Sequence, residues 1–190
     1  MEEEKKEFPI PKLHLILIML TVAIIVCAVG TLLPVDQETL ANISQQIEET
    51  RNLIRSLDFL SASLYIFSHN FALCLVMFIP LFGVGFGMYV MLSTGYATKI
   101  DALAHQISPS VAFILYFILP HFWVEFISYA LAMSQSILIT WGLYKKDFSK
   151  TLAETLKIIG ITAALLFAAA LIENRPLFRS ATKASMRTTF

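Results

Sequence analysis

Four long runs of apolar residues alternate with short polar segments along the chain. They cover residues 13–33, 59–96, 111–143 and 152–172. An α-helix needs about 20 mostly apolar residues to cross the roughly 30 Å hydrocarbon core of a bilayer. The first and last runs match one crossing each, whereas the two middle runs are too long for one straight span. The pattern predicts an all-α, polytopic transmembrane bundle of four to five spans.

Prolines interrupt both middle runs, Pro80 in the second and Pro120 in the third. Proline breaks or kinks a helix, and a membrane tolerates the break where neighbouring groups satisfy the freed carbonyl. We therefore expect residues 60–96 to form one kinked span or two spans, and residues 110–143 to form a broken span.

The second run is expected to end at Thr94–Gly95, because residues 97–108 are polar enough for a loop. Ser108 followed by Pro109 is typical of a helix start, with an N-cap and a proline at the first helical position. The chain is predicted to be one integral membrane domain, 1–190, with single spans at 13–33 and 152–173 and a basic tail at 174–190.

An amphipathic helix is predicted at 36–58, between the first two runs. Its apolar positions are separated mostly by three and four residues, as on one helix face: Leu40, Ile43, Ile47, Ile54 and Leu57. This stripe could pack on the membrane surface, on another subunit or on the protein itself.

Composition agrees with a membrane protein. Of the 190 residues, 57% are hydrophobic and 15% are charged, whereas a soluble domain is closer to a quarter charged. The formal net charge is zero, which gives no reason to expect a nucleic acid partner. Cys27 and Cys74 both lie among apolar residues, so no disulfide framework or zinc site is indicated.

The charges leave the topology open. Lys5, Lys6 and Lys12 favour a cytoplasmic N-terminus under the positive-inside rule. The last run has basic residues on both sides. Four spans place the tail inside, whereas five place the loop after residue 143 inside and the tail outside.

One carboxylate, Glu125, lies well inside an apolar run, four residues after His121. An ionisable side chain inside a membrane costs about 3 kcal/mol or more, so it needs a partner or a hydrated cavity. Candidate partners are His121 on the same helix face and the pair His69 and Asn70 on an earlier span. Glu173 marks the membrane edge of the last run. The cluster could join helices, relay protons or ions, or hold a metal ion, and joining helices is favoured.

No sequence pattern indicates catalysis or a cofactor. Gly83, Gly85 and Gly87 lack the preceding strand and the following acid of a dinucleotide site, and the spacing of Gly83 and Gly87 instead favours close helix packing. Pro80 and Pro120 belong to the same group of packing residues. The spacing of His121 and Glu125 is not that of a zinc protease, and no nucleophile motif is present. We expect no enzyme, no cofactor and no metal.

Several segments resemble stage II sporulation protein M and its archaeal relatives over roughly residues 10–178. The most specific segment is the Pro-His-x-x-x-Glu of residues 120–125, and weaker ones surround Asn70, Gly95 and Glu173. Where the family often has Asn-Asn this chain has His69-Asn70, and where it has Asn-Gly the chain has Thr94-Gly95.

The resemblance implies a multi-pass protein of the cell membrane without established enzymatic activity, whose namesake anchors a machine that remodels the cell envelope. The expected function is therefore a non-enzymatic membrane scaffold or complex subunit. Its partners would be the lipid bilayer and another protein or a second copy, with 36–58 as the docking surface. The alternative is a small proton- or ion-coupled transporter or channel that uses Glu125.

Overall fold

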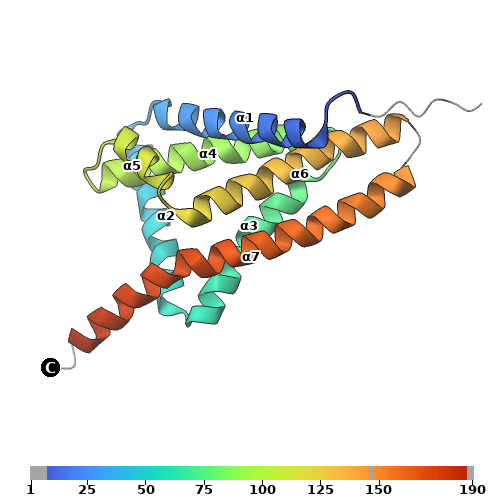
Figure 1. Cartoon of the computed structure of the whole chain (residues 1–190). Helices are drawn as coiled ribbons and strands as arrows, with labels where there is room; N and C mark the ends of the chain where they lie inside the picture. The colour runs from blue at the N-terminus through green and yellow to red at the C-terminus, as the bar shows by residue number, and fades with distance from the viewer. Residues whose placement is uncertain (1–7, 146–147, 188–190) are drawn as a thin grey trace, which may run out of the picture.

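The computed structural model describes residues 8–145 and 148–187, and within these ranges all regular structure is α-helical (Figure 1). The helices are α1 (Lys12–Leu32), α2 (Gln37–Ser56), α3 (Phe59–Met77), α4 (Gly83–Ala104), α5 (Pro109–Tyr116), α6 (Pro120–Tyr144) and α7 (Phe148–Arg187). Four segments are long and apolar enough to cross a membrane: α1, α3, α6 and Thr151–Arg175 of α7. The predicted all-α membrane bundle is confirmed.

Helices α1 and α4 lie side by side and run in the same direction (Figure 1). Near their C-terminal ends, Gly30 of α1 faces Leu92 and Gly95 of α4. Just beyond α1, the ammonium group of Lys99 donates a hydrogen bond to the carbonyl of Leu33.

Helix α6 occupies the centre of the bundle. In its most apolar window 61% of the residues are buried, against 33% or less in the other three candidate spans. Asn70 of α3 meets Glu125 of α6, and Ile79, just past α3, meets Ser136, so these two helices run parallel. Helix α7 runs antiparallel to α6, because Gln135 contacts Thr155 whereas Gly142, later in α6, lies against Thr151, earlier in α7.

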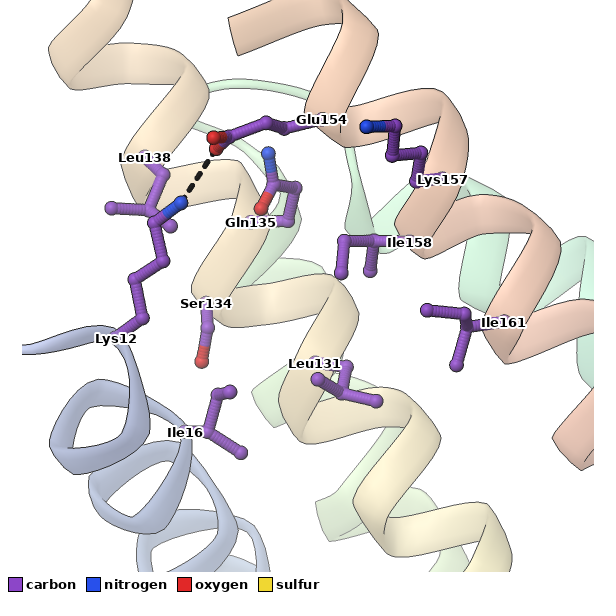
Figure 2. Close-up of a pocket in the computed structure, with 10 residues that line it drawn as sticks. All are labelled: Lys12, Ile16, Leu131, Ser134, Gln135, Leu138, Glu154, Lys157, Ile158 and Ile161. Carbon is purple, nitrogen blue, oxygen red and sulfur yellow. Dashed lines mark hydrogen bonds and ion pairs between the residues drawn. The ribbon is translucent and has the colours of Figure 1, made fainter.

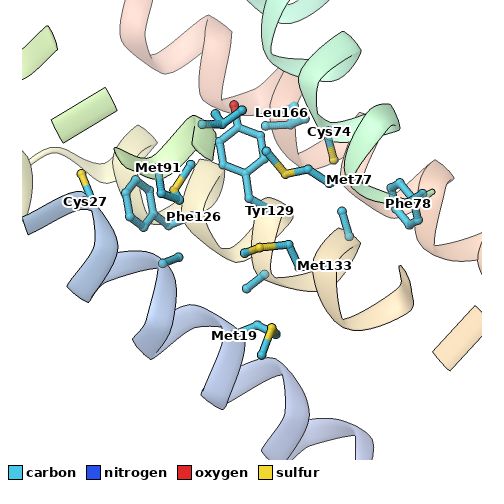
Figure 3. Close-up of a cluster of buried hydrophobic side chains, with 14 of the residues drawn as sticks. Met19, Cys27, Cys74, Met77, Phe78, Met91, Phe126, Tyr129, Met133 and Leu166 are labelled. Atoms are coloured by element: carbon cyan, nitrogen blue, oxygen red, sulfur yellow. The ribbon is translucent and has the colours of Figure 1, made fainter. Parts of the chain in front are cut away.

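Buried apolar side chains from five helices form one core (Figure 3). Many of them contain sulfur: Met19, Cys27, Cys74, Met77, Met91 and Met133. Flexible methionine side chains fill irregular gaps between helices, and here they pack beside four buried aromatic rings, those of Phe78, Phe122, Phe126 and Tyr129.

The second apolar run forms two helices separated at residues 78–82. This is one of the two arrangements expected around Pro80. Leu81 adopts a left-handed conformation with φ of 65°. The backbone groups that the turn leaves free are satisfied by α6. The N–H of Leu81 donates to the Thr140 hydroxyl at 3.0 Å, and the Ser136 hydroxyl donates to the carbonyl of Ile79 at 2.7 Å.

The break near Pro120 is also confirmed, since α5 ends at Tyr116 and Pro120 is the first residue of α6. The predicted loop at 97–108 is wrong for its first eight residues, because α4 continues through Thr94–Gly95 to Ala104. The Thr94 and Thr98 hydroxyls donate to carbonyls one turn earlier in the same helix, so neither polar residue needs a loop.

Helix α2 lies against the ends of α4, α3 and α7. Its predicted apolar stripe is half-buried on the protein, whereas most of its other side chains are exposed. Helix α7 is longer than the predicted last span and extends into the basic tail as far as Arg187. Lys5, Lys6 and the final residues of the tail lie outside the described ranges.

Candidate functional site

The carboxylate that interrupts the third apolar run has a partner on another helix. The side-chain amide of Asn70, in the middle of α3, donates a hydrogen bond to Glu125 Oε1 at 2.9 Å. Both side chains are half-buried. Hydrogen bonding across a helix interface offsets part of the cost of placing a polar group among apolar ones. Asn70 and Glu125 thus join α3 to α6.

The two histidines of the predicted cluster are placed differently. His121 is half-buried one turn before Glu125, and His69 is exposed although it is next to Asn70 in sequence. Among the described residues, no hydrogen bond joins either histidine to Glu125. A one-residue step on a helix turns a side chain by about 100°, so His69 and Asn70 cannot share a face.

A second acid lies near this contact. Glu173 of α7 is half-buried and close enough to Glu125 for the two carboxyl groups to interact electrostatically. Tyr129, one turn after Glu125 on α6, is buried beside them. The meeting point of α3, α6 and α7 therefore holds one amide, two carboxyl groups and a phenol.

Sequence reasoning missed Asn174. Its side chain is 3% exposed, and its amide donates to the Phe59 carbonyl at 2.8 Å and to the Ser63 hydroxyl at 3.0 Å. These bonds join α7 to the start of α3. The sequence could have pointed to Asn174, because it is a polar residue next to Glu173 at the end of an apolar run.

The predicted packing glycines lie at close contacts of different kinds. A Cβ on Gly87 would lie 2.4 Å from the sulfur of Met133 in α6, and one on Gly83 would lie 1.9 Å from the Met77 carbonyl. Gly83 therefore serves the turn after α3, and Gly87 serves the contact of α4 with α6.

A group of metal-binding side-chain types occurs between α2 and α4. Ligand atoms of Glu48, Asp101 and His105 lie within 4.8 Å of one another. Arg51 already bonds to both acids, to Asp101 Oδ1 at 2.9 Å and to Glu48. A metal ion would compete with this guanidinium for the same oxygens, so the geometry is that of an ion-pair network that ties α2 to α4.

The fold and its polar contacts define a polytopic helical membrane protein whose interior polar side chains connect helices. The family model for stage II sporulation protein M matches residues 14–174, so the chain belongs to this family. The resemblance noted in the sequence is confirmed. Comparisons with curated proteins and with solved structures found no match.

Proposed function

We propose that the chain is a non-enzymatic scaffold or complex subunit of the cell membrane, within machinery that remodels the cell envelope. The observation that carries the proposal is the hydrogen bond between Asn70 and Glu125. Glu125, the carboxylate deep in an apolar run, is engaged with another helix. Asn174 and Gln135 also make bonds between helices.

Helix α2 is the surface on which we expect a partner to dock. Its apolar stripe already contacts the bundle, so a partner would meet the exposed polar face, which carries Asn42, Gln45 and Glu49. Such a partner would recognise α2 mainly by hydrogen bonds and charge. Polar and charged contacts at a protein interface give specificity more than affinity.

The role of Glu125 as a structural residue is tested by two substitutions. Glu125→Gln keeps an acceptor for Asn70 and should unfold near the wild-type temperature in detergent. Glu125→Leu leaves the Asn70 amide without its acceptor and should lower the free energy of unfolding by about 1 kcal/mol. A double-mutant cycle with Asn70→Leu should give a coupling energy of the same order. A coupling energy of zero would show that the bond does not hold the bundle.

The role as a subunit is tested by gentle extraction from native membranes, cross-linking and mass spectrometry. A partner in fixed stoichiometry, cross-linked through Lys or Glu residues on or beside α2, supports the scaffold. A homo-oligomer without a companion contradicts the role as a subunit of a larger assembly.

A second function, proton- or ion-coupled transport, is favoured by the two interacting carboxyl groups Glu125 and Glu173. Acids within transmembrane segments commonly mark ion pathways. In liposomes, Glu125→Gln should then abolish pH-driven flux while the protein remains folded. Flux that persists in this variant rules out Glu125 as the transport residue.

A further inference from the structure

A groove of about 310 Å³ lies where the first turns of α1 and α7 stand apart over α6 (Figure 2). Each helix turns one regular face toward it. The α7 wall begins at Glu154 and ends at Ile161, and the α6 floor begins at Leu131 and ends at Leu138. Within each set the residues occupy positions i, i+3, i+4 and i+7, so they lie on one face of their helix.

Charged side chains gather at one end of this groove. Lys12 of α1 and Glu154 of α7 form an ion pair of 2.6 Å between the two walls. Lys157 is exposed, and no ion pair is found for it among the described residues. Figure 2 shows its ammonium group at the same end as Glu154. Two lysines and one glutamate leave an excess of one positive charge.

The other end of the groove is apolar. It is lined by Ile16, Leu131, Ile158 and Ile161. From Glu154 to Ile161 the helix rises by about 10 Å, so the charged rim lies near the N-terminal end of the segment Thr151–Arg175, which is able to cross the membrane, and the apolar end lies deeper in that segment. The cavity thus changes from charged to apolar in the direction that leads from the surface into the bilayer.

An unpaired hydroxyl lies between the two ends. Ser134 Oγ is buried and has no hydrogen-bond partner among the described residues, and its side chain is 2% exposed. An unsatisfied buried hydroxyl is costly, so native proteins rarely keep one without a water or ligand nearby. In Figure 2 the Ser134 hydroxyl points toward Ile16, below the charged end.

We propose that this groove binds one anionic phospholipid from the leaflet at the N-terminal ends of α1 and α7. The phosphate binds the ammonium group of Lys157 beside the ion pair of Lys12 and Glu154, because lysine acts as a point charge for a phosphate. The polar backbone of the lipid reaches the depth of Ser134, and one hydrocarbon chain follows Ile158 and Ile161. The single excess charge matches a headgroup with one negative charge and disfavours a zwitterionic headgroup.

The test is native mass spectrometry of the delipidated full chain, titrated with phosphatidylglycerol or phosphatidylcholine. The wild-type protein should bind one phosphatidylglycerol molecule more tightly than phosphatidylcholine. Lys157→Gln should weaken phosphatidylglycerol binding about fivefold, the usual effect of one lysine near an anionic headgroup. Ile161→Trp should lower the binding of both lipids by filling the apolar end, and Ile161 is exposed enough for the fold to accept it.

The matched control is Lys145→Gln. Lys145 lies at the same end of the bundle but outside the groove, over the rings of Trp141 and Tyr144. Its loss should leave the affinity unchanged. An equal loss in the two lysine variants would mean general surface attraction and would overturn the proposal. Equal affinity for the two lipids, or binding that Ile161→Trp leaves unchanged, would overturn it as well.

Discussion

At the scale of single residues, glycines allow α1 and α4 to approach each other closely. A Cβ on Gly95 of α4 would lie 1.9 Å from the Cys27 carbonyl oxygen, and one on Gly30 of α1 would lie 2.2 Å from the Leu92 carbonyl oxygen. In a membrane, where apolar side chains gain little by leaving lipid, such close approach of backbones is a main source of helix association. Gly30 and Gly95 therefore determine how closely α1 and α4 pack.

We predict that Gly95→Ala and Gly30→Ala each lower the free energy of unfolding by 1–3 kcal/mol, the usual cost of overpacking a tight contact. Gly85 is the control, because a Cβ there would meet nothing within 4 Å. Gly85→Ala should be neutral or stabilising by up to about 1 kcal/mol, since alanine favours the helix. Thermal unfolding in detergent measures the stability of all three variants. Similar losses of stability for Gly95→Ala and Gly85→Ala would contradict the close contact of α1 with α4.

The sequence indicated the position of Glu125 because an ionisable side chain in an apolar run has a high free-energy cost. A carboxylate in an apolar run needs a partner, and Asn70 was among the candidates for Glu125. The sequence could not show that His69 points outward, because that depends on which face of α3 meets α6. The contact of Gly30 with Gly95 was missed because it joins two distant helices, and Gly95 resembled a helix end.

At the scale of one element, α2 depends on the residue that precedes it. Asp36 is the N-cap, and its carboxylate accepts hydrogen bonds from the Thr39 backbone N–H and the Thr39 hydroxyl, both at 2.8 Å. The bond from the Thr39 N–H, followed by that from the hydroxyl, lowers the pKa of Asp36 below its usual value. The ionised carboxylate is the form that caps the helix.

We predict that α2 loosens at acid pH before the bundle does. Because the pKa of Asp36 is lower in the folded chain, its capping contribution is fully present above the ordinary aspartate pKa of about 3.9 and is lost as the pH falls through the lowered value. Hydrogen exchange of α2 should show less protection in Asp36→Ala than in wild type at neutral pH. The two should converge in acid, and a difference that persists there would contradict the role of the carboxylate.

The elements themselves were largely predictable, since apolar runs and the period of α2 follow directly from burial and from lipid. The end of α4 was not. Thr94, Thr98 and Lys99 look like loop residues, yet the threonine hydroxyls bond within the helix and Lys99 bonds to the end of α1. A single sequence does not show whether a polar side chain forms its hydrogen bonds within its own helix, with a neighbouring helix or with water.

At the scale of the whole molecule, the helix directions alternate along the chain. Helices α1, α4 and α7 run one way, and α3 and α6 run the other way (Figure 1). If α1 crosses the membrane, α4 crosses beside it, although its hydropathy does not place it among the four candidate spans. With α4 counted, the chain would make five crossings, and the α6–α7 connection would lie on the same side as the first turn of α1.

We predict that α2 and the connection between α4 and α5 share one side of the membrane, with the α6–α7 connection on the other. Single cysteines at Asn42, Ser110 and Lys145, all exposed, can be labelled with an impermeant maleimide in oriented vesicles. Cys27 and Cys74 can remain, because they are buried. Asn42→Cys and Ser110→Cys should label together. Labelling from opposite sides would mean that α3 and α4 make one crossing, giving four in total.

The parallel pairing of α1 with α4 has a consequence for how the protein is made. Helix α4 contains four glycines and carries Lys99 and Asp101 in its last two turns, so it enters lipid less readily than the candidate spans. The surface on which it packs is α1, which leaves the ribosome before α2 and α3. The first helix must therefore stay beside the insertion machinery until the fourth emerges, so that α4 enters the bilayer onto a surface of protein rather than into lipid alone. The order of synthesis is then part of the information that determines the fold.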